Sequence, residues 1–369
     1  MSDLRYWVGF NIVRGIGPTR LRALLDYFGD IERAWHAPVE ELHSTGLDRR
    51  SLENLLAARA ALDLDRMLER IATAGAQVLT WESPGYPRLL REISDPPPVL
   101  YVKGALVEED AWAIAIVGTR RASAYGREVT RQLSAALARS GITIVSGLAR
   151  GIDAEAHWAA LKAGGRTIAV LGCGIDQVYP PEHRQLAEEI TAHGALVSDY
   201  PLGTQPEGVN FPPRNRIISG LSLGVLVTEA GVRSGALITA DYAAEQGRDV
   251  FAVPGSILAR SSAGTNALVR DGAKVVLGPE DILEELNLTM VAEQTEARQV
   301  LPSDATEAAL LARLSAEPAH VDELQQQVGL PIAQVTSTLA LMELKGMVRQ
   351  VGGMKYVVAR EPGVEYIVD

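Results

Sequence analysis

The chain is poor in the features that mark secreted, membrane and metal-binding proteins. It has one cysteine, Cys173, in 369 residues, which excludes an intrachain disulfide and a cysteine metal cluster. It contains no run of 18 uncharged apolar residues, so no membrane span is expected. Its first residues, MSDLRYWVGF, lack the basic start and the long apolar region of a signal peptide. These absences favour a cytoplasmic protein without a membrane partner.

Signatures of nucleotide-dependent and hydrolytic enzymes are also missing. There is no Walker A loop, and residues 118–123 (GTRRAS) do not fit a dinucleotide loop, because arginines occupy the space that the pyrophosphate needs. No G-x-S-x-G elbow is present, and Ser146 and Ser234 have no evident base partner, so we interpret both as turn hydroxyls. Metal-ligand spacings are absent as well. We therefore expect no catalytic residue, no metal and no cofactor.

Basic residues are in deficit, with 35 Lys and Arg against 46 Asp and Glu and a net charge of −11. The deficit lies in the flanks, because residues 110–280 contain 16 basic and 16 acidic side chains. The local field, not the net charge, decides whether an anion binds. The composition therefore permits a nucleic-acid partner without pointing to one.

The most informative stretch is 113–153, which predicts a strand, a glycine turn, a helix and a second parallel strand. Both strands end in a small-residue turn that carries arginine: Gly118-Thr119-Arg120-Arg121 and Gly147-Leu148-Ala149-Arg150-Gly151. Ligands of open parallel sheets bind outside the carboxyl ends of the strands. Guanidinium groups and backbone N–H groups at that edge suit a phosphate.

The same alternation continues to residue 277 and predicts an α/β fold, a Rossmann-like doubly wound parallel sheet. Strands are expected at 113–117, 142–146, 167–171, 195–199, 223–228, 249–253 and 274–277. Helices are expected at 124–139, 153–163, 182–193, 214–221, 236–247 and 264–271. The lead-in 73–112 is expected to add strands at 76–81 and 99–103 to the sheet edge. We place the domain that contains this sheet at 73–286.

The flanking regions are different in character. Residues 1–72 are expected to be all helix, and the turn Gly15-Ile16-Gly17 is either a helix-hairpin-helix that contacts a DNA phosphate or an ordinary turn between packed helices. Residues 287–304 are acidic and aperiodic and predict a linker.

The C-terminal region 305–369 has the pattern of a winged helix. Three helices are expected near 305–315, 320–328 and 331–345, followed by strands at 347–351 and 354–358. The third helix has no Lys or Arg before Lys345, which favours protein contact over DNA contact.

Two further strand-end loops carry arginine. The first ends in Phe211-Pro212-Pro213-Arg214-Asn215-Arg216, and the second contains Arg233-Ser234-Gly235. A loop aromatic beside arginines can stack a nucleobase while the guanidinium groups hold its phosphates, although Phe211 can equally fill a gap between sheet and helix. Arginine in four of the six loops on one predicted edge favours a polyanion.

Several motifs of the central region closely resemble those of DNA-processing protein A (the DprA, or Smf, family). They are VGTRRASAYG (117–126), SGLARGID (146–153), FPPRNRIISG (211–220), SGALITA (234–240), VFAVPG (250–255) and GTNALVRDGA (264–273). The flanks are similar to the longer members of that family, with an N-terminal SAM-like helical domain and a C-terminal winged helix. The chain departs from the family at Thr119 and Ala236, where serine is expected, at Asp199, where glutamate is expected, and at Glu182, where a basic residue is common.

The resemblance implies a non-enzymatic recombination mediator of natural transformation. Such a protein binds and protects incoming single-stranded DNA, forms a homodimer through its Rossmann-like domain and loads the RecA recombinase. The family's glycine, hydroxyl, arginine motif corresponds to Gly118, Thr119 and Arg120, and its phenylalanine–arginine loop to Phe211, Arg214 and Arg216. Together the predicted DNA-binding residues are Gly118, Thr119, Arg120, Arg121, Gly147, Arg150, Gly151, Phe211, Arg214, Asn215, Arg216, Arg233, Ser234 and Gly235.

Two other functions are compatible with a Rossmann-like sheet. A phosphoribohydrolase-like enzyme that cleaves nucleotides would carry PGGxGTxxE, whereas the comparable stretch here, EAGVRSGALITA (229–240), lacks the double glycine and the following glutamate. A purely structural dimer scaffold would bind no nucleotide polymer.

Overall fold

The computed structural model describes residues 4–288, 305–315, 318–344 and 347–358. The chain divides into two compact units, 1–288 and 289–369, and each is described by itself. Most of the predicted linker 287–304 lies outside the described residues. No helix in the described ranges is both long and apolar enough to cross a membrane.

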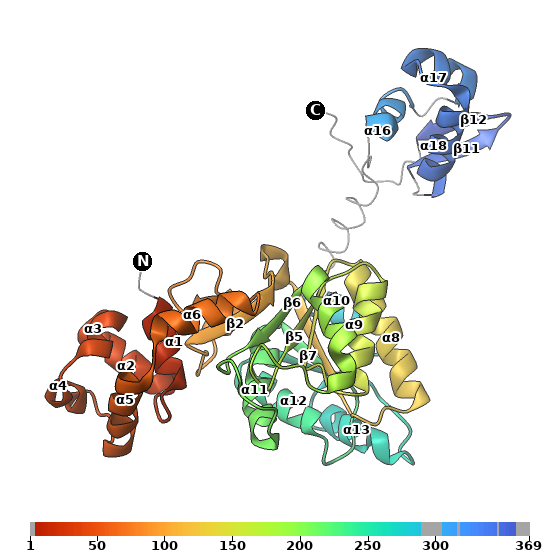
Figure 1. The fold of residues 1–369 in the computed structure, drawn as a ribbon. Coiled ribbons are helices and arrows are strands. Elements are labelled where there is room, and N and C mark those ends of the chain that lie inside the picture. The colour runs from red at the N-terminus through yellow and green to blue at the C-terminus, as the bar shows by residue number, and fades with distance from the viewer. Residues whose placement is uncertain (1–3, 289–304, 316–317, 345–346, 359–369) are drawn as a thin grey trace. The chain divides into compact units, whose positions relative to one another are not determined.

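Helices form the first part of the 1–288 unit, as predicted (Figure 1). They are α1 (Leu4–Ile12), α2 (Pro18–Phe28), α3 (Ile31–His36), α4 (Val39–Ser44), α5 (Arg49–Ala61) and α6 (Leu64–Thr73). Trp7 and Phe10 of α1 are fully buried in a hydrophobic core that also contains Val99 and Tyr101 of the sheet. The helical region therefore packs against the sheet and shares its core.

A nine-stranded sheet follows, in the order β1-β2-β6-β5-β4-β3-β7-β8-β9. The strands are β1 (Gln77–Thr80), β2 (Val99–Gly104), β3 (Ala113–Gly118), β4 (Thr143–Ser146), β5 (Thr167–Val170), β6 (Ala195–Ser198), β7 (Gly224–Glu229), β8 (Asp249–Ala252) and β9 (Lys274–Val275). From β6 to β9 all neighbours pair in parallel, with Ala115 of β3 opposite Val145 of β4 and Val225 of β7. The lead-in strands β1 and β2 pair antiparallel beside β6, which confirms the prediction that this segment extends the sheet.

Helices cover both faces of the sheet, which is why its central strands are continuous apolar runs. They are α7 (Arg88–Arg91), α8 (Ala124–Arg139), α9 (Ile152–Lys162), α10 (Arg184–His193), α11 (Phe211–Gly220), α12 (Gly235–Glu245), α13 (Ala263–Arg270) and α14 (Glu280–Glu285). The short helix α7 was not expected from the sequence. The chain winds from β3 outward to β6 and then returns to place β7 beside β3. This reversal is the topological switch point, where doubly wound sheets open a crevice for ligands.

The C-terminal unit has the winged-helix elements in the predicted order, namely α16 (Ala305–Leu311), α17 (Val321–Val328), α18 (Ile332–Leu344), β11 (Val348–Gly352) and β12 (Lys355–Val358). A short strand not expected from the sequence, β10 (Ala319–His320), pairs with β12 and completes a three-stranded sheet. The wing turns at Gly352 and Gly353, which both have positive φ. Leu324, Val335 and Leu339 are fully buried in this unit's own core.

Candidate nucleic-acid interface

The turns after β3 and β4 are in direct contact at the carboxyl edge of the sheet. Gly151 has a φ of +80°, and a Cβ at this position would lie 2.3 Å from the carbonyl oxygen of Thr119. The N–H of Ile152 donates to that same oxygen at 3.2 Å. Gly151 therefore lets the two arginine-bearing turns approach each other as no larger residue could.

Asp153 holds the turn after β4 in shape. Asp153 lies at the start of α9, and its Oδ2 accepts hydrogen bonds from the N–H groups of Gly147 (3.1 Å) and Ala149 (3.3 Å). Burial raises the pKa of the Asp153 carboxyl, and the positive charge of Arg214 opposes that rise. The N–H of Gly147 already donates to Asp153 and is not free for a phosphate. The glycine is needed here for close packing, because a Cβ would lie 2.8 Å from Nη2 of Arg214.

Three side chains lie around the ring of Phe211, and we call these and Phe211 together the Phe211 cluster. The guanidinium carbon of Arg120 lies 5.5 Å from the ring centroid and that of Arg214 lies 5.7 Å from it. The ring of Tyr179, from the loop after β5, lies 5.6 Å away at an interplanar angle of 35°. Phe211 is half-buried, so the ring keeps an accessible part beside an exposed arginine. The predicted convergence of Arg120, Phe211 and Arg214 is thus a feature of the structure.

Arg214 is a buried part of this cluster, with 4% of its surface exposed. Its Nη1 donates to the carbonyl oxygens of Gly147 (3.0 Å) and Val170, at the ends of β4 and β5. Its Nε donates to Oδ1 of Asn215 at 3.2 Å. These hydrogen bonds fix the guanidinium at the sheet edge. There it packs beside Phe211 and adds positive potential to the site from a buried position.

Arg216 does not join the cluster. It is 8% exposed, and its guanidinium forms ion pairs with Asp95 (3.1 Å) and Asp199 (2.9 Å). The sequence-based expectation that Arg216 faces a phosphate does not match this position. Its charge is neutralised inside the fold, between the lead-in segment and the end of β6.

Arg150 is exposed and lines a small cavity together with Arg120, Phe211 and Arg214. Its Nε donates to Oε1 of Glu182, from the 3-10 turn before α10. The hydrogen bond from Arg150 holds the pKa of Glu182 below its usual range. One cation of the predicted edge, Arg150, is therefore neutralised by an acidic side chain.

A larger cavity of about 360 Å³ opens at the switch point between β3 and β7, and we call it the switch-point cavity. Its walls include Val117 and Arg120 from the end of β3, and Phe211 and Asn215 from α11. The start of α12, from Gly235 to Thr239, closes the opposite side. The volume is in the range of small-ligand sites, and the combination of an aromatic, an amide and a cation suits a nucleobase with its phosphate.

The remaining predicted residues lie along the same edge. Arg121 is exposed and follows Thr119, whose Oγ1 accepts from the N–H of Arg121 at 3.2 Å. Arg233 is exposed in the loop after β7, and Ser234 is the N-cap of α12. In the described part of the chain, no ion pair involves Arg120, Arg121 or Arg233. Among the exposed arginines predicted from the sequence, these three are therefore unpaired in the described ranges, whereas Arg150 is paired with Glu182.

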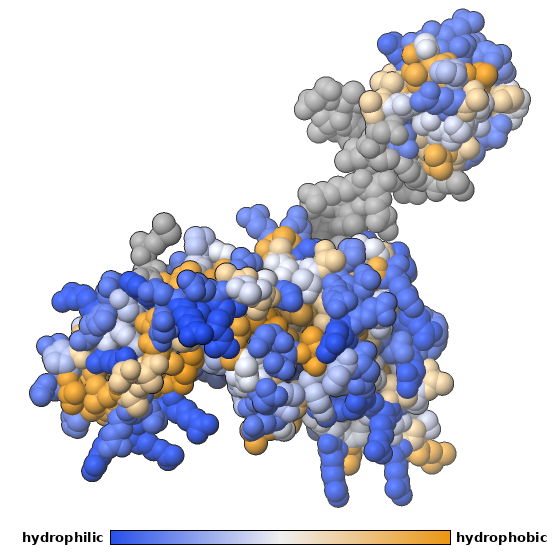
Figure 2. Space-filling view, in the orientation of Figure 1, coloured by the Kyte–Doolittle hydropathy of each residue, from blue (hydrophilic) through white to orange (hydrophobic). Residues whose placement is uncertain are grey.

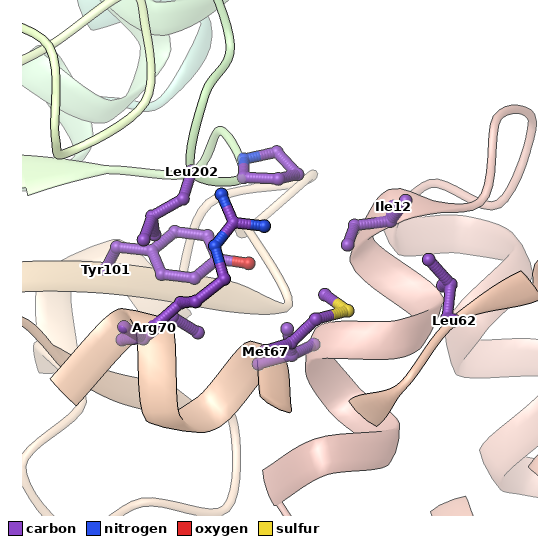
Figure 3. Close-up of a pocket in the computed structure, with 9 residues that line it drawn as sticks. Ile12, Leu62, Met67, Arg70, Tyr101 and Leu202 are labelled. Atoms are coloured by element: carbon purple, nitrogen blue, oxygen red, sulfur yellow. The ribbon is translucent and has the colours of Figure 1, made fainter. Parts of the chain in front are cut away.

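A third cavity, of about 150 Å³, is mostly apolar. It lies between α1, α6, β2 and the loop after β6, and apolar side chains such as Ile12, Leu62 and Met67 line it (Figure 3). Arg70 is the one charged side chain in its wall. Nearby, Nδ2 of Asn11 donates to the carbonyl oxygen of Asp199 at 3.3 Å. This region anchors the loop that leads to Phe211.

Sequence reasoning missed two residues that shape the site, Tyr179 and Asp153. Tyr179 stands in a polar loop after a predicted strand, which is the same signal that singled out Phe211. Asp153 ends the quoted motif SGLARGID and is the first residue of the expected helix 153–163, where a carboxylate can accept free N–H groups.

The fold and the site define a class: a Rossmann-like protein with a winged-helix unit, in which an arginine-flanked aromatic replaces the dinucleotide loop. A family model described as DNA recombination-mediator protein A matches residues 77–287, and one described as the DprA winged helix domain matches residues 294–354. The chain belongs to this DprA/Smf family of DNA-processing, recombination-mediator proteins.

Individual relatives agree along the chain. Protein Smf of Synechocystis is 39% identical and aligns with 96% of this chain and 98% of its own. DNA processing protein DprA of Bacillus subtilis is 46% identical over 60% of this chain and 75% of its own. The X-ray structure of DprA from Streptococcus pneumoniae superposes with a TM-score of 0.69 at 36% identity, covering 77% of this chain and 99% of that one. A structure of the Helicobacter pylori protein, which concerns its single-stranded DNA binding mode, has a TM-score of 0.53 at 31% identity and covers 58% and 98% of the two chains.

Proposed function

We propose that this protein is a single-stranded DNA-binding recombination mediator, which protects incoming DNA and loads RecA during natural transformation. The observation that carries the proposal is the Phe211 cluster, in which a half-buried ring lies beside two guanidinium groups at the carboxyl edge of the sheet. The single-stranded DNA binding described for the Helicobacter pylori relative supports it.

Each element of the cluster has a defined physical task. The accessible part of Phe211 stacks a base, an interaction worth about 1–3 kcal/mol per base. Arg120, Arg121 and Arg150 hold phosphates, while buried Arg214 positions the ring and strengthens the local field. Stacking accepts every base, so we expect little sequence preference. Single strands are favoured because a base in a duplex cannot reach the ring without leaving its stack.

The activity that we propose is binding without turnover. The stretch EAGVRSGALITA (229–240) forms the loop after β7 and the first turns of α12, with Ser234 as the cap of the helix. Oγ of Ser234 accepts from the N–H of Ala236 at 3.4 Å, as expected for a helix N-cap. We expect the purified protein to bind nucleoside monophosphates weakly and to leave them intact.

We further propose that two copies associate through the Rossmann-like sheet. The edge strand β9 is short, and Val275 and the neighbouring Leu277 are exposed beside it. An unpaired sheet edge with exposed apolar side chains is a template for contact with another chain. Light scattering should give twice the chain mass, and Val275→Asp should reduce it to that of one chain.

The decisive experiment for the DNA-binding role compares Phe211→Ala with the unaltered protein on single-stranded and double-stranded oligonucleotides. We expect the variant to remain folded and to lose affinity for the single strand. Equal affinities of the two proteins for single strands would contradict the proposal.

A further inference from the structure

A second group of side chains lies further along the same sheet edge, and we call it the outer rim. It consists of Val232 and Arg233 from the loop after β7 and of Ile257, Leu258 and Arg260 from the loop after β8. Ile257 and Leu258 are each 91% exposed, and Val232 is 68% exposed. Burial of exposed apolar side chains is favourable, so this surface is stabilised when an occupant covers it. Figure 2 shows hydrophobic side chains beside protruding hydrophilic ones at the end of the 1–288 unit where α12 and α13 lie.

The two loops of the outer rim are held in place. Oδ1 of Asn266 accepts from the N–H of Gly255, and its Nδ2 donates to the carbonyl oxygen of the same glycine, both at 3.1 Å. The hydroxyl of Tyr125 donates to the carbonyl oxygen of Pro254 at 2.9 Å. The N–H of Gly264 donates to the carbonyl oxygen of Ala230 at 2.7 Å, which ties α13 to the loop after β7. The exposed apolar side chains therefore stand on a fixed base, and little ordering is needed when they bind.

The outer rim continues the Phe211 cluster in space. Strands β4, β3, β7 and β8 are successive parallel neighbours, so the loops at their carboxyl ends follow one another along one edge. With about 4.8 Å between strands, the loop after β8 lies roughly 14 Å from the loop after β4. A strand bound at the cluster can reach the outer rim with its next nucleotides.

The charge of these loops identifies a polyanion as the occupant. Residues 118–123, 230–234 and 253–262 contain four arginines (Arg120, Arg121, Arg233 and Arg260) and no Asp or Glu. Within the described ranges, none of the four forms an ion pair. A second copy related by a two-fold axis through this surface would place arginine against arginine with no acid to neutralise them. Arginines with interspersed apolar side chains match a single strand, whose phosphates and bases alternate.

We propose, resting on the proposed function, that the outer rim is a second contact site for the same DNA strand. Ile257 and Leu258 contact bases beyond the one stacked on Phe211, and Arg233 and Arg260 hold the phosphates between them. The site binds single-stranded DNA of sufficient length and adds affinity only once the Phe211 cluster is occupied.

The test is a series of oligothymidylates of increasing length, bound by the full chain and by the double variant Ile257→Ser/Leu258→Ser. Val39→Ser, at an exposed valine on α4, is the control. We expect short strands to bind the double variant as they bind the unaltered protein, and long strands to bind it about tenfold more weakly. A second double variant, Arg233→Gln/Arg260→Gln, should make the salt dependence shallower. For long strands the magnitude of the slope of log affinity against log salt should fall by about 1.4, with Arg88→Gln/Arg139→Gln as the equal-charge control.

Three results would overturn the proposal, and each identifies a different failure. If both outer-rim variants bind every length normally while Phe211→Ala loses affinity, the outer rim is outside the strand's path and the proposed function stands. If Phe211→Ala also binds normally, the proposed function itself fails. If light scattering shows that Ile257→Ser/Leu258→Ser changes the oligomeric mass, a second copy covers this surface instead.

Discussion

The carboxyl edge of the sheet and the winged-helix unit both belong to folds that can meet DNA, yet they differ in charge. The edge loops 118–123, 230–234 and 253–262 carry four arginines and no acid. Helix α18, the equivalent of a recognition helix, spans Ile332–Leu344 and has no Lys or Arg, and α17 contributes Asp322 and Glu323. Since phosphate neutralisation dominates DNA affinity, we expect most of the affinity at the sheet edge, and a protein partner for the winged helix stays a prediction.

Charge reversal at Arg120 should break the edge most completely. Arg120→Glu puts a negative charge beside Phe211, where a phosphate has to sit, and we expect affinity for single strands to fall at least about 100-fold. Arg120 is exposed, so the melting temperature should hardly change. Fluorescence anisotropy measures the effect, with Arg139→Glu as the control. Undiminished binding by Arg120→Glu would show that DNA does not bind at this edge of the sheet.

Removing Arg216 should affect stability and leave DNA binding intact. Arg216→Ala leaves the largely buried Asp199 unpaired, and loss of one partner of a buried pair costs about 3–5 kcal/mol. We expect about 3 kcal/mol here, because Asp95 is half-exposed and can be hydrated. Urea unfolding measures this loss. A folded variant with reduced DNA affinity and unchanged stability would show that Arg216 does contact the strand.

Truncation of Phe211 should weaken binding by the value of one stacked base. We expect roughly 5- to 150-fold lower affinity for Phe211→Ala, and near-complete recovery for Phe211→Tyr, which restores an aromatic face. If Phe211 only fills a gap between helix and sheet, Phe211→Ala would lower the melting temperature at unchanged affinity. Binding and thermal unfolding, measured on both variants, separate the two roles.

Neutralising Glu182 should produce the smallest change, and in the opposite direction. Glu182→Gln releases Arg150 from its ion pair, and we expect affinity to rise by up to about fivefold, the range of an exposed pair. Arg150 holds the pKa of Glu182 low in the free protein. We expect a phosphate that binds Arg150 to weaken this ion pair and so to raise the pKa of Glu182. DNA binding should therefore take up a proton. The affinity should increase as the pH falls from the higher pKa of Glu182 in the complex toward its lower pKa in the free protein.

The Glu182→Gln variant should lose this pH dependence. Its control is Glu188→Gln, at an exposed glutamate on α10. A variant whose affinity and pH profile both equal those of the unaltered protein would show that Arg150 takes no part in binding.

The sequence was sufficient for the features that depend on local pattern. Apolar runs such as 113–117 and 223–228 predict the buried strands, because a parallel sheet is covered on both faces. The meeting of Arg120 with Phe211 follows from their positions after parallel strands, whose carboxyl ends share one edge.

The ion pairs that neutralise individual arginines were not accessible from the sequence. Arg216 looks identical in character to Arg214, and only the fold brings Asp95 and Asp199 to its guanidinium. The pairing of Arg150 with Glu182 depends likewise on how the loop after β5 folds back over the turn after β4. Charge can be counted in a sequence, but its neutralisation is decided by tertiary contacts.

The most direct measurement is a salt titration of single- and double-stranded oligonucleotide affinity for the full chain and for residues 1–288, which form a compact unit. We expect both proteins to prefer the single strand. We also expect both to show the same slope of log affinity against log salt concentration, about −0.7 for each phosphate neutralised. A much smaller slope for residues 1–288 than for the full chain would place the phosphate contacts in the winged helix and contradict the account.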